Sequence, residues 1–223
     1  MTTEDTPRTV PSTAPALDVY YLESVEQVKV LAEPIRYRMS ILLERPRTCA
    51  GLARLLGLSR AKAHYHLKQL EQVGLAIPDA EVLKNGIVEK YYISVGRMLN
   101  FGQLIPNDGS VPPGNVAPET FGAISSFLAA MLDVSRENAS AVSSAEALKK
   151  GYFFDFEASL TEDQYRAVRR RLVDMSEEIV SLSRANLEGP PDADLVSFHI
   201  TNYLTTTPGQ PPEDDTEEDP CTA

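Results

Sequence analysis

The stretch from Thr48 to Gly74 constrains the fold of this chain most, because two helical patterns follow each other across the turn Gly57-Leu58-Ser59. Thr48 is a natural N-cap for the first helix, and Gly57 ends it. The residues of this helix that we expect to face inward are Leu52, Leu55 and Leu56. Ser59 caps the second helix, which runs from Arg60 to Gly74. Two helices joined so closely are typical of a helix-turn-helix unit.

Two shorter helices are predicted before this unit. Ser24 and Gln27 have capping-box spacing at the start of the first helix. Its apolar residues are Val25, Val28 and Leu31. Pro34 suits the first turn of the next helix, and Pro46 stops it. The apolar stripe of that helix comprises Ile35, Met39, Leu42 and Leu43.

A β-hairpin is predicted after the unit. Residues Leu75–Val82 and Ile87–Val95 have strand composition, and Leu83–Gly86 separates them. Asn85-Gly86 between apolar runs is a strong hairpin signal. The sequence therefore predicts an α+β protein whose N-terminal domain is a winged helix-turn-helix.

The same stretch resembles the ArsR-like winged helix-turn-helix transcriptional regulators in the order and spacing of its motifs, over about a third of the chain. The matching motifs are LAEPIRYRMSILL, LARLLGLS, HYHLKQLEQVGL and the hairpin around Asn85-Gly86. Gly51 stands where the family commonly has an acidic residue, and His64 stands where it often has a small hydroxyl residue. The resemblance implies a recognition helix at Arg60–Gly74 and a wing that meets phosphate or the minor groove.

The helical period sorts the recognition helix into two faces. The inward face is expected to hold Ala63, His66, Leu67 and Leu70. The candidate DNA-binding residues are Ser59, Arg60, Ala61, Lys62, His64, Tyr65, Lys68, Gln69 and, at the hairpin tip, Lys84 and Asn85. Arg and Lys can pair with guanine and Gln with adenine in the major groove. The lysines could instead form an ordinary solvated face, and Arg36 could either brace the domain or touch the DNA backbone.

Charge is divided unevenly along the chain. Val25–Met98 contains twelve Lys or Arg against seven acids, a local charge of +5, whereas the whole chain carries -11, so the rest carries -16. Such asymmetry is expected when one module meets a polyanion, although an excess of this size also fits a solvated surface.

The second half is predicted to form a mostly helical domain with short strands. A helix opens at Pro118 and continues toward Gly151, with an apolar stripe of Phe121, Ile124, Leu128 and Met131. Short strands are expected at Tyr152–Phe156 and Leu195–Leu204. The aromatic residues at 152–156 could line a ligand pocket, although core packing is the expected role.

Another helix opens at Thr161 and Gln164, which again have capping-box spacing. Its apolar seam comprises Tyr165, Val168, Leu172, Met175, Ile179 and Leu182. The seam could drive dimerisation or pack on the 118–150 helix of the same subunit. Gly189-Pro190-Pro191 is expected to end this helix.

The predicted domain organisation is a disordered tail over 1–18, the winged helix over 19–98, a linker over 99–117, a dimerisation or effector domain over 118–206 and a disordered acidic tail over 207–223. The last tail contains the acidic run Glu213–Asp219. It either keeps the protein soluble or competes with DNA for the basic face.

The sequence contains no pattern typical of a metal site or a catalytic site. Cys49 stands alone in its helix, His64 and His66 point to different faces, and His199 is remote. Cys49 could be a redox-active thiol near a helix N-terminus, although an inert buried cysteine is the expected role. We therefore expect neither a cofactor nor enzymatic activity.

The sequence predicts a cytoplasmic transcriptional regulator without a membrane segment. We expect a homodimeric repressor that binds double-stranded operator DNA, with a C-terminal domain that mediates dimerisation or responds to a small-molecule or protein effector. The alternative is a winged-helix module that binds proteins and no DNA.

Overall fold

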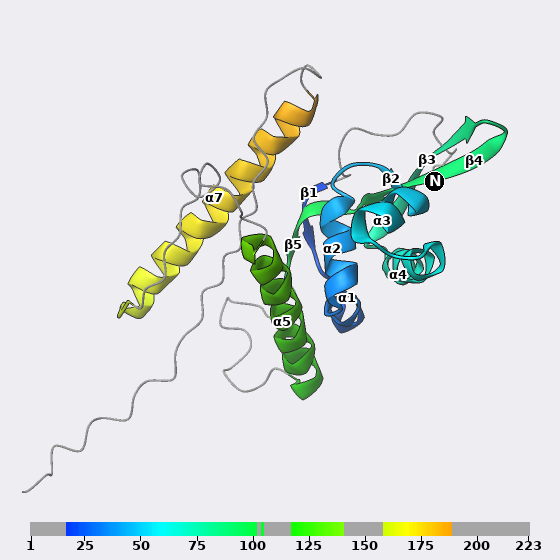
Figure 1. The fold of residues 1–223 in the computed structure, drawn as a ribbon. Coiled ribbons are helices and arrows are strands. Elements are labelled where there is room, and N and C mark those ends of the chain that lie inside the picture. The colour runs from blue at the N-terminus through cyan, green and yellow to red at the C-terminus, as the bar shows by residue number, and fades with distance from the viewer. Residues whose placement is uncertain (1–16, 102–103, 105–116, 141–157, 189–223) are drawn as a thin grey trace, which may run out of the picture.

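The fold is α+β, with the winged helix at its N-terminal end (Figure 1). The structure is a computed structural model, and it describes residues 17–101, 104, 117–140 and 158–188. The predicted strands at 152–156 and 195–204, the helical region beyond Ser140, His199 and both predicted tails up to residue 16 and from 207 lie outside the described residues.

The four helices of the winged domain form where the capping signals place them. They are α1 (Val25–Leu31), α2 (Pro34–Leu42), α3 (Cys49–Leu56) and α4 (Arg60–Gln72). The side chains of Ser24, Thr48 and Ser59 each accept a hydrogen bond from the backbone of the helix that they cap. Gly57 adopts the left-handed conformation (φ 64°) that ends α3. Each prediction of a helix here is confirmed.

The N-terminal capping box is only half formed. Ser24 Oγ accepts from the Gln27 backbone N–H at 3.3 Å, but Gln27 Oε1 accepts from the N–H of Glu23 at 2.8 Å. The Gln27 side chain is buried, and its Nε2 donates to Val73 O and Tyr20 Oη. Gln27 therefore ties α1 to the end of α4.

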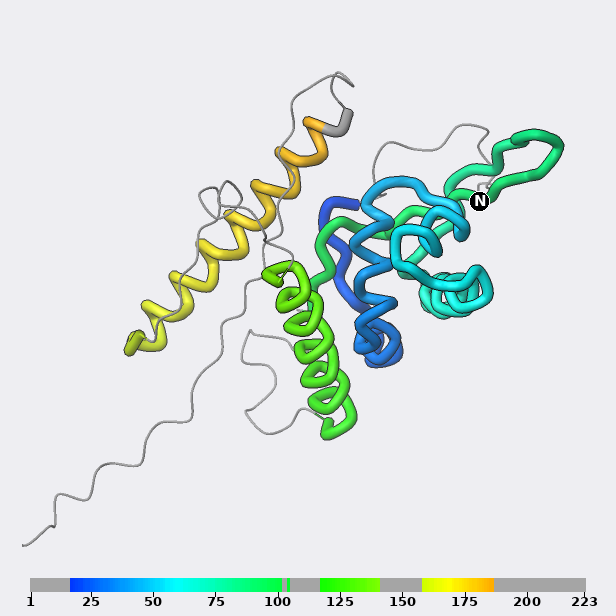
Figure 2. Tube along the Cα trace, in the orientation of Figure 1, coloured from blue at the N-terminus to red at the C-terminus, as the bar shows by residue number. Residues whose placement is uncertain are grey.

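The wing is the antiparallel pair of β3 (Ala76–Lys84) and β4 (Ile87–Ser94), and β2 (Arg47–Thr48) adds a third strand beside β4. Asn85 (φ 51°) and Gly86 (φ 78°) form the turn, which confirms the hairpin signal. The strands reach closer to the turn than predicted, since Lys84 pairs with Ile87. The hairpin projects well beyond the helices (Figure 2).

The core of the winged domain is built from one apolar face of each helix. Its most deeply buried large side chains are Leu22, Val28, Leu31, Met39, Leu43, Leu52, Leu67, Leu70 and Leu75. The prediction that Leu55 faces inward is wrong, because that side chain is 50% exposed. Ala53 occupies the buried position instead, since α3 turns its 52–53 edge toward α2 and α4.

A second small sheet joins the two ends of the domain. β1 (Leu17–Tyr21) pairs in parallel with β5 (Gly96–Asn100). The predicted boundaries at residues 18 and 98 therefore need correction, because each divides a strand. Gly96 allows the close approach of the two strands, since a Cβ there would lie 2.7 Å from Tyr20 Cβ.

α5 (Pro118–Ser140) packs across α1 and α2. Its buried residues are Ala123, Phe127, Ala130 and Val134. The prediction that Phe121 begins the buried stripe of this helix is therefore wrong, because its side chain is 69% exposed. Ile124 and Met131 are only partly buried, at the edge of the contact with the core. The Phe127 ring lies 5.2 Å from that of Tyr37 and 4.8 Å from that of Phe101, which sets the face that α5 presents.

α7 (Glu162–Glu188) begins with the predicted capping box. Thr161 Oγ1 accepts from Gln164 N–H at 3.3 Å, and Gln164 Oε1 accepts from Thr161 N–H at 2.9 Å. The helix contacts β1 and lies on the opposite side of the molecule from the wing (Figure 1). Among the α7 side chains from 162 to 186, none is buried.

Polar contacts connect α7 to the winged domain. Arg184 pairs with Asp18 of β1 at 3.2 Å. Arg97 Nη1, on β5, donates to Ser183 Oγ at 3.1 Å and pairs with Glu44 at 2.8 Å. No helix within the described ranges is long and apolar enough to cross a membrane.

Candidate nucleic-acid interface

The first two turns of α4 present a polar, cationic surface. Ser59 forms the N-cap, with its Oγ accepting from Lys62 N–H at 3.2 Å. The exposed side chains that follow are Arg60, Ala61, Lys62, His64 and Tyr65. The opposite face is buried as expected, at Ala63, His66, Leu67 and Leu70. The structure thus brings together the predicted candidates at this end of the helix.

The later candidates on α4 are already engaged within the helix. Lys68 is half-buried and forms an ion pair with Glu71 at 2.5 Å. This hydrogen bond to Glu71 raises the pKa of Lys68. Gln69 donates to Gln72 Oε1 at 3.0 Å. The cations most available to a ligand therefore lie at the N-terminal end of α4.

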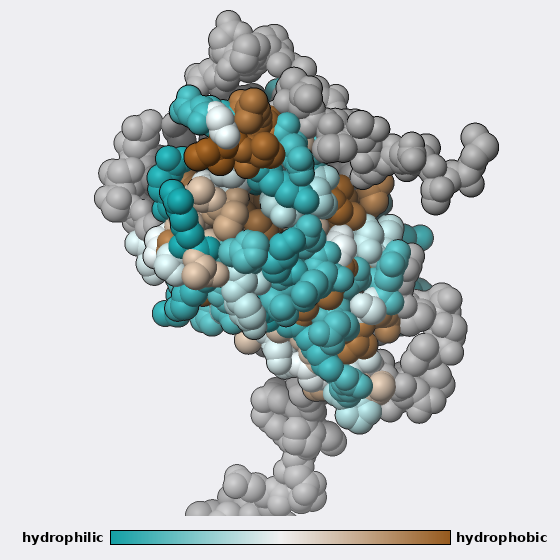
Figure 3. All heavy atoms as spheres, turned by 90° about the vertical axis from the view of Figure 1, so that its right-hand side faces the viewer, coloured by the Kyte–Doolittle hydropathy of each residue, from teal (hydrophilic) through white to brown (hydrophobic). Residues whose placement is uncertain are grey.

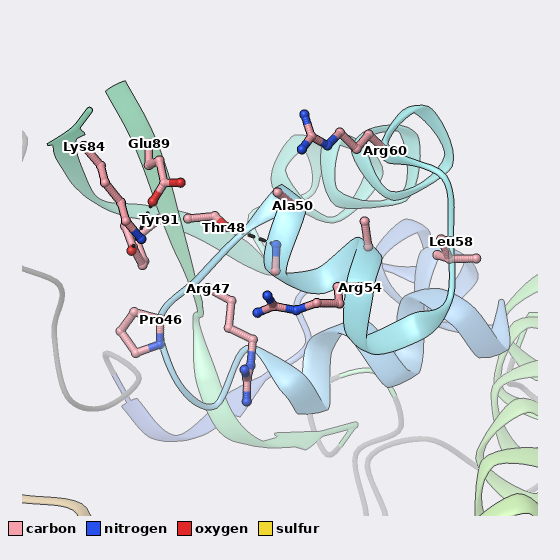
Figure 4. Close-up of a pocket in the computed structure, with 12 residues that line it drawn as sticks. Pro46, Arg47, Thr48, Ala50, Arg54, Leu58, Arg60, Lys84, Glu89 and Tyr91 are labelled. Carbon is pink, nitrogen blue, oxygen red and sulfur yellow. Dashed lines mark hydrogen bonds between the residues drawn. The ribbon is translucent and has the colours of Figure 1, made fainter. Parts of the chain in front are cut away.

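A cavity of about 540 Å³ opens between α3, the start of α4 and the wing (Figure 4). Its cationic residues are Arg47, Arg54, Arg60 and Lys84. Glu89 is the one carboxylate residue among those lining it, and Tyr91 lies beside Glu89 on the wing. Figure 4 shows Arg54 reaching from α3 into the opening, with Lys84 on the wing side. Cationic residues that line a concave surface suit a phosphate backbone.

Arg47, on β2, is held in position by the C-terminal end of α2. Its Nε donates to Leu42 O at 2.7 Å, and the side chain is half-buried. Burial, assisted by the charge of Arg45, lowers the pKa of Arg47 from its ordinary value. Guanidinium groups nevertheless stay protonated in proteins, so Arg47 contributes positive charge at the cavity.

Arg47 and Arg54 are interface candidates that sequence reasoning missed. Both precede the recognition helix, and the pairing of β2 with β4 and the packing of α3 against α4 bring them to the cavity that Lys84 also lines. Their signal in the sequence is weak: a charged residue on the solvent side of a short helix, and another beside a helix cap. Arg36, by contrast, braces the domain, because its Nε donates to Val30 O.

Asn85 stands at the exposed tip of the wing, next to Lys84. Its positive φ and the glycine that follows make the tip a narrow two-residue turn. The two predicted wing candidates therefore differ in place: Lys84 lines the cavity, and Asn85 lies at the outer end of the hairpin.

His66 is a packed residue of the recognition helix, as predicted. It is 7% exposed, and its Nδ1 is buried without a hydrogen-bond partner. Burial lowers its pKa below the ordinary value of 6.5. The neutral ring is therefore favoured in the folded domain.

Because His66 is buried, we predict that the free energy of unfolding depends on pH through the protonation of this residue. Below pH 6.5 the unfolded chain binds the proton more readily than the folded one, so stability falls as pH drops from 6.5 toward the folded-state pKa. The difference in free energy of unfolding between wild type and His66→Leu should change over this window and level off above it. Urea denaturation at pH 5.5 and 7.5 measures this difference. A difference that is equal at both pH values would contradict the prediction.

Cys49 begins α3 beside the cavity and is half-buried. Burial raises the pKa of its thiol, and nearby Arg60 opposes this only in part. A raised pKa disfavours the thiolate that redox chemistry would need. Within the described residues, no group of three or more His, Cys, Asp or Glu is placed to hold a metal ion.

Comparison with known proteins is consistent with this geometry. Residues 31–77, which span α2, α3 and α4, match a family model described as a helix-turn-helix domain. No curated protein matches the chain. The chain therefore contains a helix-turn-helix domain, which supports a DNA-binding function in transcription regulation.

Proposed function

We propose that this chain is a homodimeric transcriptional repressor that resembles the ArsR-like regulators and binds operator DNA. The observation that carries the proposal is the cavity whose cations come from β2, from α3, from the start of α4 and from the wing hairpin. A duplex with its backbone in this cavity would have the exposed first turns of α4 beside its major groove. The cavity would then bind the phosphates of the same DNA molecule whose bases α4 contacts.

Base recognition is assigned to the exposed residues of α4. Arg60 and Lys62 can donate to guanine O6 and N7, and Tyr65, 57% exposed, can contact a base or a sugar. Lys68 is assigned a supporting role, since a contact with DNA would compete with its ion pair to Glu71. The proposed activity is binding without catalysis, carried out in the cytoplasm.

Repression would follow from occupancy of promoter DNA, with the C-terminal half responding to an effector. The contacts of Arg97 with Ser183 and of Arg184 with Asp18 offer a route for such a response. A movement of α7 would pull on β1 and β5, which close the winged domain.

The test is binding of the full-length protein to DNA from upstream of its own gene and to scrambled DNA, measured by fluorescence anisotropy over a salt series. We expect specific binding whose log affinity falls linearly with log salt. Binding that shows no sequence preference at any salt would contradict operator recognition. No binding even at low salt would contradict the DNA-binding proposal itself.

A second candidate function, protein binding through the wing, is favoured by one observation. Leu83, Ile87 and Val88 at the wing tip are 71%, 69% and 58% exposed. Figure 3, which views the molecule from the side of the wing, shows hydrophobic surface gathered near its upper end. Exposed apolar groups of this kind often mark interaction sites. A Leu83→Ser, Ile87→Ser variant that loses a protein partner while DNA affinity is unchanged would support this function.

A further inference from the structure

We propose that α7 pairs with α7 of a second copy in the antiparallel direction, and that Arg171 of each copy then meets Glu178 of the other. The inference deepens the proposed function, because it names the surface through which the regulator dimerises. It rests on the distribution of apolar and charged residues along α7 and on the exposure of their side chains.

The apolar seam of α7 remains open on one side. Met175 is 43% exposed and Leu182 is 58% exposed. The other seam residues are partly exposed, and none of them is fully buried. The seam residues, Tyr165, Val168, Leu172, Met175, Ile179 and Leu182, follow steps of three and four residues, which is the spacing of a coiled coil. In a symmetric dimer of this 27-residue helix, the six seam residues of each copy could form six layers of paired side chains, three on each side of the two-fold axis.

The seam is symmetric end to end, because its steps are three, four, three, four, three. An antiparallel pair therefore brings each residue of the first half against one of the second. Tyr165 meets Leu182 of the other copy, and Leu172 meets Met175 near the two-fold axis. Large residues thus pair with smaller or flexible ones in every layer.

Charge decides between the antiparallel and parallel arrangements. From Tyr165 to Val173 the helix carries four cations and no acid, at Arg166, Arg169, Arg170 and Arg171. From Asp174 to Leu182 it carries three acids and no cation, at Asp174, Glu177 and Glu178. Antiparallel pairing lays each basic half along an acidic half, whereas parallel pairing lays the three consecutive arginines beside their own copies.

The residues that flank the seam give the pairing its specific contacts. Arg171 and Glu178 each directly precede a seam residue, Leu172 and Ile179, and both are exposed. In an antiparallel coiled coil, flanking positions of this kind meet each other across the interface. The two-fold axis repeats the Arg171–Glu178 contact, so each dimer contains two copies of it.

The test is the dimer dissociation constant of the full-length protein without DNA, measured by sedimentation equilibrium. The wild type should reach twice the 24.5 kDa chain mass. Arg171→Glu and Glu178→Arg should each weaken the dimer by about tenfold, because each single change places two pairs of like charges together. The double variant should return to within about threefold of wild type, because opposite charges face each other again.

Arg170→Glu is the matched control: it makes the same charge change on the neighbouring residue, which does not flank the seam. It should weaken the dimer by less than about threefold. A monomeric wild type, single variants equal to the control, or a double variant at least as weak as the singles would each overturn the proposal.

A cysteine pairing experiment reports the direction of the helices independently. In a background with Cys49→Ser and Cys221→Ser, a mixture of Leu172→Cys and Met175→Cys protein should form an intermolecular disulfide faster than either variant alone. Faster pairing of each variant with itself would show parallel helices and overturn the proposal. A dimer that behaves as proposed but binds no DNA would contradict the proposed function and leave this inference standing.

Discussion

Replacing both Arg54 and Arg60 with alanine will lower DNA affinity by roughly 10- to 100-fold at moderate salt. Both side chains are exposed and line the cavity between α3, α4 and the wing. Arg54 is expected to contact a phosphate and Arg60 a base, so the slope of log affinity against log salt should become shallower by about one. Fluorescence anisotropy over a salt series measures both quantities on one DNA duplex.

The control for this variant is Arg166→Ala with Arg170→Ala. These residues are also exposed, but they lie on α7, on the other side of the molecule from the wing. The control removes the same charge and should leave the salt slope unchanged. Equal losses in both variants would show a general effect of net charge and contradict the assignment of the cavity. Both variants should keep their stability to within about 0.5 kcal/mol, because all four residues are on the surface.

The winged domain could be predicted because its signals are local. Thr48, Ser59 and Gly57 act on residues within one turn of themselves, and Asn85-Gly86 determines a hairpin without help from the rest of the chain. The residues that the helical period placed inside α4 are buried for the same reason. Short-range chemistry is therefore enough for the helices and the wing.

The β1–β5 sheet could not be predicted in this way. Its strands are separated by the whole winged domain, and each is only five residues long. No predicted turn accounts for a glycine at position 96. The need for glycine there is visible only in the folded structure, where Tyr20 packs against it. Pairing between distant short strands depends on a tertiary arrangement that a local pattern does not contain.

The candidate interface shows the same division. The α4 candidates follow from the period of one helix, and the structure exposes the first five of them after the cap. Arg54 joins them because α3 packs against α4, and Arg47 joins them because β2 pairs with β4. A sequence pattern can identify a face of one element, but a cavity lined by several elements depends on how they pack together.

The face that α5 turns toward the core distinguishes its two phenylalanines. Phe121 and Phe127 lie on the same helix, and the apolar period alone favours Phe121 as a core residue. In the structure Phe121 is 69% exposed and Phe127 is 4% exposed. Phe127→Ala should therefore lower the free energy of unfolding by about 3 to 5 kcal/mol, whereas Phe121→Ala should change it by less than about 0.5 kcal/mol. Urea denaturation of the two variants measures both values.

The physical reason is the aromatic cluster that Phe127 forms with Tyr37 of α2 and Phe101 after β5. Removing the ring leaves a cavity against α1 and α2 and takes away two ring contacts at once. If Phe121→Ala were the more destabilising change, the sequence period would be right and the observed packing of α5 wrong. Equal and small effects would mean that α5 does not contribute to the stability of the winged domain. A large loss at Phe127 alone would show that α5 folds as part of the same cooperative unit as the helices that carry the DNA-binding surface.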